Sequence, residues 1–106
     1  MPIPEISPDA LAPRIGQVVL IDVRQPDEYA SGHLRTARLI PLHELPDHLG
    51  ELPVDEDVVV MCRTGARSGV ASEFLIENGV SAFNLVGGIL AWAEAGHEVV
   101  AADQPA

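Results

Sequence analysis

The sequence has no lysine, only one cysteine and 4% aromatic residues. The absence of lysine excludes Schiff-base catalysis and a lysine general base. A single cysteine cannot form a disulfide within the chain, and the four histidines lack the spacing of a metal site, so no metal ion is expected. The chain also lacks any apolar run near the roughly 20 residues that a helix needs to cross a bilayer.

Positive charge is scarce as well, because six arginines are outnumbered by 16 acidic residues and the formal net charge is −10. Such a chain repels nucleic acid and anionic membranes, so neither is an expected partner. The opening residues M-P-I-P-E-I-S-P show neither the basic region nor the apolar run of a signal peptide, which predicts a cytoplasmic location. With 106 residues and 47% hydrophobic content, we expect one domain over residues 1–106, ending in a loose tail at 101–106.

Short apolar segments alternate with helical or turn-like segments along the whole chain. The predicted strands are 3–6, 18–23, 38–40, 58–61 and 82–86. The predicted helices begin near Pro8 and Pro26 and continue with 42–49, 67–78 and 87–95. This alternation predicts an α/β fold, with a parallel sheet of about five short strands covered by helices on both faces. In such sheets the ligand site lies at the carboxyl ends of the strands.

The most informative segment is V-V-V-M-C-R-T-G-A-R-S, residues 58–68, which places the only cysteine directly after a buried strand. We expect a six-residue loop, 62–67, between this strand and the next helix, and loop amides at a helix N-terminus favour negative charge. Gly65 permits the positive φ that such a loop needs. With Arg63 and Arg67 on either side, the pKa of Cys62 should be lowered. The alternative is an inert core cysteine, but two unpaired arginines could not be buried beside it.

Polar residues also lie at the carboxyl end of the second predicted strand, so they should lie near Cys62 at the same edge of the sheet. Asp22 is expected to orient loop amides or Arg67, and Arg24 to pair with Glu28 behind the site. The alternative makes Asp22 a helix cap and the Arg24–Glu28 pair a surface ion pair. A supporting structural role is favoured over direct catalysis for these three residues.

Three segments resemble the signatures of rhodanese-type sulfurtransferases. The run C-R-T-G-A-R-S resembles the family's active-site loop, L-I-D-V-R-Q-P-D-E-Y-A-S-G-H-L (20–34) is similar to its first signature, and N-L-V-G-G-I-L-A-W-A-E-A-G (84–96) to its closing one. They fall in the family's order and span most of the chain. The sequence departs from the pattern at Thr36 and Leu39, where the family usually has a glycine and an asparagine.

The resemblance implies a single-domain rhodanese that transfers a sulfane sulfur from thiosulfate or a persulfide donor. Cys62 would carry the sulfur as a persulfide, with no other cofactor, and pass it to cyanide, a small thiol or a protein thiol. The anion-binding loop would comprise Arg63, Thr64, Gly65, Ala66 and Arg67. The supporting residues would be Asp22, Arg24, Glu28 and Ser68.

Two other functions stay open at this point. A cysteine phosphatase or arsenate reductase also holds a thiolate in a loop with an arginine, but such loops have five residues between the two. Here Arg67 leaves four intervening residues and Ser68 stands at the phosphatase position. The second alternative is a noncatalytic or dedicated sulfur-carrier or docking module with the same fold.

Overall fold

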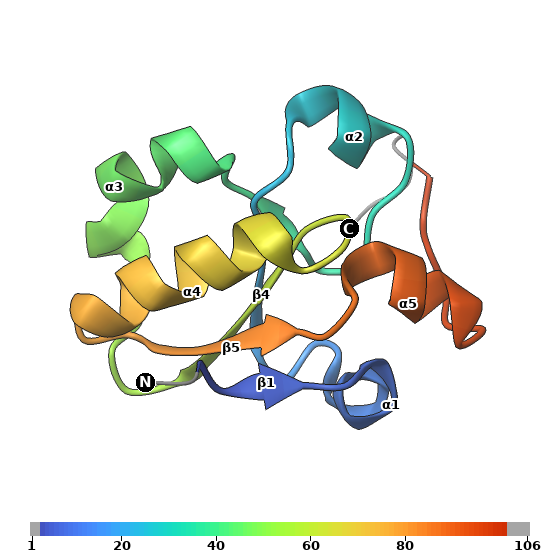
Figure 1. Cartoon of the computed structure of the whole chain (residues 1–106), viewed down its shortest axis with the longest axis horizontal. Helices are drawn as coiled ribbons and strands as arrows, with labels where there is room; N and C mark the ends of the chain where they lie inside the picture. The colour runs from blue at the N-terminus through green and yellow to red at the C-terminus, as the bar shows by residue number, and fades with distance from the viewer. Residues whose placement is uncertain (1–2, 102–106) are drawn as a thin grey trace.

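The computed structural model describes residues 3–101 and contains one five-stranded sheet (Figure 1). The strand order is β1-β5-β4-β2-β3, and all neighbouring pairs are parallel. The strands are β1 (Glu5–Ile6), β2 (Val19–Asp22), β3 (Arg38–Leu39), β4 (Asp57–Met61) and β5 (Ser81–Leu85). This sheet confirms the predicted α/β fold with five short parallel strands.

Helices connect the strands and cover both faces of the sheet. The α-helices are α1 (Pro8–Leu11), α2 (Pro26–Ala30), α3 (Leu45–His48), α4 (Ala66–Glu77) and α5 (Gly88–Glu94). Three 3₁₀ segments accompany them: η1 (Ala12–Arg14), η2 (Leu42–Glu44) and η3 (Leu49–Glu51). One face of the sheet packs against α3 and α4, and the other packs against α1 and α5. Figure 1 shows α5 beside the carboxyl end of β5.

The alternation of side chains along β4 decides which face receives the cysteine. Val58, Val60 and Cys62 belong to the core on the α4 side, whereas Val59 and Met61 belong to the core on the α5 side. All five are at most 1% exposed, as expected for the central strand of a covered parallel sheet. Cys62 therefore leaves the sheet at its carboxyl edge, pointing toward the beginning of α4.

The predicted strands each overlap an observed one, with ends that differ by at most two residues. The loop after β4 is shorter than expected, because α4 already begins at Ala66 and only 62–65 lie outside regular structure. Thr36 has a positive φ of 70°, a conformation that suits the glycine usual in the family at this place. Of the expected tail at 101–106, only Ala101 lies within the described residues.

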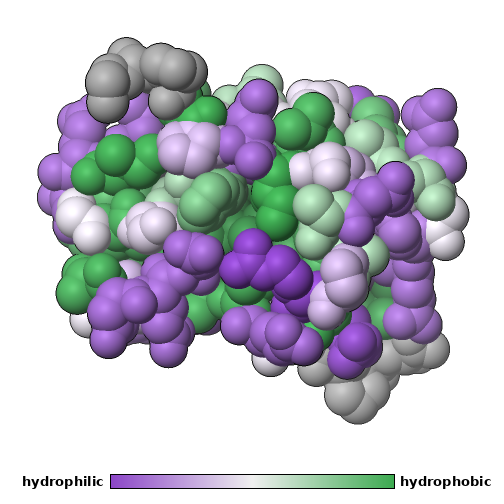
Figure 2. Space-filling view, turned by 90° about the horizontal axis from the view of Figure 1, so that it is seen from below, coloured by the Kyte–Doolittle hydropathy of each residue, from purple (hydrophilic) through white to green (hydrophobic). Residues whose placement is uncertain are grey.

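The face shown in Figure 2 carries apolar and polar side chains in interspersed patches. Single exposed apolar side chains are usual on protein surfaces and need no partner to explain them. Within residues 3–101, no helix is long and apolar enough to cross a membrane.

Candidate active site

In the loop after β4, the first two carbonyls point at α5 and the later amides point at the Cys62 sulfur. The backbone N–H of Ile89 donates to the Cys62 carbonyl at 2.9 Å, and that of Leu90 donates to the Arg63 carbonyl at 3.2 Å. These donors belong to the first turn of α5, where N–H groups have no partner inside their own helix. Gly65 then takes a φ of +104°, as its predicted role in the loop requires. The amides of Gly65 itself and of Ser68 then point at the cysteine.

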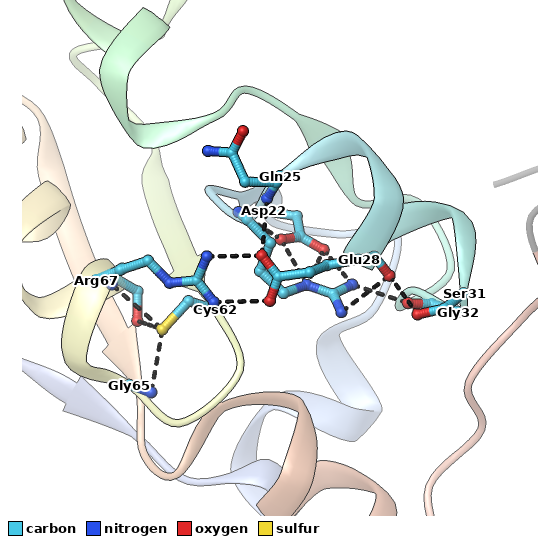
Figure 3. A network of polar contacts seen from close by, with 10 residues as sticks. Asp22, Gln25, Glu28, Ser31, Gly32, Cys62, Gly65 and Arg67 are labelled. Atoms are coloured by element: carbon cyan, nitrogen blue, oxygen red, sulfur yellow. Dashed lines mark hydrogen bonds and ion pairs between the residues drawn. The ribbon is translucent and has the colours of Figure 1, made fainter.

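The sulfur of Cys62 lies at the centre of this loop, within hydrogen-bond distance of three donors (Figure 3). The Gly65 amide is 3.1 Å from Sγ, the Ser68 amide 3.4 Å and the Ser68 hydroxyl 3.3 Å. Burial raises the pKa of the Cys62 thiol, but hydrogen bonds from Ser68, Gly65 and Thr64 together outweigh it, so the pKa lies below its ordinary value. The site therefore favours the thiolate.

The Arg67 side chain reaches across to α2 and binds Glu28 through two hydrogen bonds (Figure 3). The two N–O distances are 2.7 and 2.8 Å, the bidentate geometry in which a guanidinium binds a carboxylate most strongly. Glu28 also accepts the Gln25 amide at 3.0 Å. These bonds, led by the one from Arg67, lower the pKa of Glu28 to about 2 despite its partial burial. The pair fastens the start of α4 to α2.

A second ion pair lies at the end of β2, and it is buried. The Arg24 guanidinium contacts the Asp22 carboxylate at 2.7 Å, and these side chains are 5% and 0% exposed. Arg24 also donates to the main-chain oxygens of Glu28 and Gly32, at 3.2 and 2.8 Å. A buried ion pair is tolerated only when its remaining donors and acceptors are hydrogen-bonded in this way. Arg24 thus ties the middle of α2, and the turn that follows it, to the end of β2.

Asn84, near the end of β5, completes the polar contacts beneath the loop. Its Oδ1 is 2.5 Å from the Ser68 hydroxyl, and its Nδ2 donates to the Gly65 carbonyl at 3.1 Å. Asn84 was not among the site residues predicted from the sequence. An asparagine in an otherwise apolar strand, A-F-N-L, was the available signal, because a buried amide needs polar partners.

The sequence of the chain matches the Rhodanese-like domain family over residues 7–95, a stretch that contains the whole loop and both ion pairs. The chain belongs to the rhodanese-like family. It is 42% identical over 101 residues to a protein of Allochromatium vinosum named Sulfurtransferase, which covers 92% of this chain and 94% of the relative. It is 33% identical over 84 residues to Thiosulfate sulfurtransferase GlpE of Stutzerimonas stutzeri, covering 78% and 77%.

A solved structure gives the same assignment. The crystal structure of a rhodanese-related protein from Thermoplasma volcanium has a TM-score of 0.87 and 34% sequence identity, and the match covers 92% of this chain and 97% of that one. The relatives' names support a sulfurtransferase, and the structural match confirms the rhodanese fold.

The structure of this rhodanese-like protein brings most of the expected site residues together, but the ion pairs of Arg24 and of Glu28 differ from those expected. The expected pair between Arg24 and the Glu28 carboxylate is wrong, because Arg24 binds Asp22 and the Glu28 carboxylate binds Arg67. Asp22 accordingly orients Arg24 instead of the loop amides or Arg67. Asp22 is the last residue of β2 and Arg24 follows two positions later, whereas Glu28 and Arg67 are 39 residues apart in the sequence.

The other loop residues differ in how far they reach solvent. Arg63, Thr64 and Ala66 are exposed, whereas Ser68 is fully buried against the sulfur. Arg63 makes no ion pair within residues 3–101 and lines a groove of about 280 Å³, together with Leu90 and Val99. Of the two arginines expected to attract an anion, Arg63 is thus the one whose charge is available to a ligand.

The Glu28–Arg67 pair should make stability depend on acidic pH. Because the pKa of Glu28 is lowered from 4.5 to about 2 on folding, its stabilisation is complete above pH 4.5 and is lost as the pH falls toward 2. Glu28→Gln should lower the free energy of unfolding at pH 7 by about 1 kcal/mol, a value limited by solvent screening of this partly exposed pair. Urea titrations at pH 7 and pH 2.5 would measure the difference.

Asp27→Asn, at an exposed neighbour on α2, is the matched control and should have a much smaller effect at either pH. An equal loss for Glu28→Gln at both pH values would contradict the assigned ion pair, because the carboxyl is increasingly protonated near its pKa.

Proposed function

We propose that this protein is a sulfurtransferase that moves a sulfane sulfur from thiosulfate, or from a related persulfide donor, through a Cys62 persulfide to a thiophilic acceptor. The observation that carries the proposal is the position of Sγ, which lies within hydrogen-bond distance of three donors inside a loop at the edge of the sheet. Preorganised donors of this kind stabilise an anion without rearrangement during the reaction.

In the first half-reaction the Cys62 thiolate attacks the outer sulfur of thiosulfate. The new bond joins Sγ to that sulfur, the old sulfur–sulfur bond breaks, and its electron pair leaves with sulfite. The cysteine then carries a persulfide whose negative charge lies on the outer sulfur. Arg63 supplies the positive charge that attracts the anionic donor, and the Glu28–Arg67 pair holds the loop in place.

In the second half-reaction an external nucleophile attacks the outer sulfur and the thiolate of Cys62 is restored. Cyanide would leave as thiocyanate, and a thiolate would leave as a persulfide. Because the chain has only one cysteine, no second thiol of its own can accept the sulfur. The acceptor is therefore an external small thiol, a protein thiol or cyanide, and no metal or organic cofactor is needed.

Mass spectrometry of the intact protein tests this proposal directly. Incubation with thiosulfate should add the mass of one sulfur atom, and subsequent cyanide should remove it while producing an equal amount of thiocyanate. Prior alkylation of Cys62 should block the gain. A protein that gains no sulfur from thiosulfate or from a persulfide donor would overturn the proposal.

The position of Arg67 favours sulfur transfer over phosphate hydrolysis. A phosphatase arginine must reach the oxygens of a bound phosphate, whereas Arg67 follows Cys62 after four residues and is bound to Glu28. An aryl phosphate should therefore not be hydrolysed at a useful rate. Phosphatase turnover equal to thiosulfate turnover would replace the proposed activity but leave the fold and the reactive cysteine in place.

A dedicated sulfur carrier is the second candidate, because the same Cys62 loop would serve it equally well. The two differ in the acceptor that they use. Comparing the turnover of free thiosulfate and cyanide with the transfer of labelled sulfur to protein thiols would distinguish them. Rapid turnover with small substrates supports the enzyme, and transfer confined to protein thiols supports the carrier.

A further inference from the structure

The Ser68 hydroxyl lies between two hydrogen-bond acceptors but has a single proton to donate. Its oxygen is 3.3 Å from the Cys62 sulfur and 2.5 Å from Oδ1 of Asn84. All three residues are buried, with exposed fractions of 0% for Ser68, 1% for Cys62 and 9% for Asn84. A hydroxyl group donates one hydrogen bond at a time, so the sulfur and the amide oxygen compete for it.

The orientation of the Asn84 amide follows from its second contact. The Gly65 carbonyl can only accept, so the atom 3.1 Å from it must be the nitrogen of the amide. The opposite atom, Oδ1, can only accept and is directed at Ser68. Asn84 is held in this position by β5, where it is paired in register with Val60 of the central strand. The side chain therefore offers the hydroxyl a fixed acceptor.

We propose that Asn84 is a positioning residue that competes with the Cys62 thiolate for the single hydroxyl proton of Ser68. When Cys62 carries its proton, the sulfur is a weak acceptor and Ser68 donates to Asn84. When Cys62 ionises, the hydroxyl turns to the negatively charged sulfur, since hydrogen bonds to charged acceptors are about twice as strong as neutral ones. In the persulfide the charge lies on the outer sulfur, so the hydroxyl can return to Asn84. No covalent bond changes in these steps.

A double-mutant cycle tests the competition through the ionisation of Cys62. The midpoint of Cys62 alkylation by iodoacetamide against pH would be measured for the unmodified protein, Asn84→Ala, Ser68→Ala and the double variant. In the unmodified protein, ionisation of Cys62 costs Ser68 its hydrogen bond to Asn84, and without the competing acceptor this cost disappears. Asn84→Ala should therefore lower the midpoint when Ser68 is present. This downward shift should be about one pH unit larger than the shift that Asn84→Ala causes in the Ser68→Ala background.

The cycle separates this effect from a merely structural one. If Asn84 only braced the Gly65 carbonyl, its removal would shift the midpoint equally in both backgrounds, and such a result would overturn the proposal. The charged groups near the sulfur are Arg63, Arg67 and Glu28, with the Asp22–Arg24 pair behind them, and they are common to all four proteins. Their contributions cancel in the comparison.

Two further measurements keep the test decisive. The ultraviolet absorbance of the thiolate gives the same midpoints without a chemical probe. If Asn84→Ala does not fold, Asn84→Val removes the same polar atoms with a side chain that suits a strand. Because no sulfur donor is present, a failed cycle would leave the proposed sulfurtransferase activity standing, and a failed thiosulfate assay would leave the cycle interpretable. The inference rests on the proposed function only for its place in the catalytic cycle.

Discussion

Replacing Cys62 by serine should abolish sulfur transfer. The variant should gain no mass from thiosulfate, and thiocyanate production should fall by at least about three orders of magnitude, to the uncatalysed background. A serine hydroxyl stays protonated near neutral pH, so the loop has no anion to stabilise and no sulfur nucleophile to attack the donor. The mass of the intact protein and the rate of thiocyanate formation measure the two losses.

The variant should keep its fold, because serine is close to cysteine in shape and its oxygen can accept hydrogen bonds from Gly65 and Ser68 in place of the sulfur. Circular dichroism and thermal unfolding would establish this. Thiocyanate formation at the native rate by a folded Cys62→Ser protein would mean that another group holds the sulfur, and the site assignment would be wrong.

The parts of the site that depend on neighbouring residues could be predicted from the sequence. The apolar run 58–61 and the cysteine after it indicated a strand and a loop, and the structure has both. Gly65 was expected to take a positive φ because a tight loop before a helix needs one, and its φ is +104°. A lowered pKa for Cys62 was also expected, and its direction agrees.

The loop amides were expected to lower this pKa, but the hydrogen bond from the Ser68 hydroxyl was not, because it depends on contacts across the fold. Arg63 and Arg67 flank the cysteine in the sequence and were expected to lower its pKa. In the structure Arg67 is bound to Glu28, and the hydrogen bonds to the sulfur come mainly from Ser68 and Gly65. Which carboxylate reaches which guanidinium is decided by how α2 lies against α4. Asn84 was missed for the same reason, since its approach to Ser68 depends on the pairing of β4 with β5.

Adding a methyl group to α5 at Gly88 should reduce both stability and sulfur transfer, because the Cys62 and Arg63 carbonyls of the loop pack against this position. A Cβ at Gly88 would lie 2.5 Å from the carbonyl oxygens of both Cys62 and Arg63, where only backbone could give way. Gly88 also has a φ of +60°, which costs a residue with a side chain about 1–2 kcal/mol. Gly88→Ala should therefore lower the free energy of unfolding by about 2–4 kcal/mol.

The catalytic loss should exceed what instability alone would produce. Moving the Cys62 and Arg63 carbonyls off α5 rotates the amides that point at the sulfur, and a displacement of about 1 Å in positioned groups can reduce a rate on the order of a hundredfold. Gly79→Ala is the matched control, because Gly79 has a φ of +85° but open space around the added Cβ. It should lose about 1 kcal/mol of stability and keep its rate of sulfur transfer. If folded Gly88→Ala matched this control in both stability and thiocyanate formation, the contact between α5 and the loop would not position the reactive sulfur.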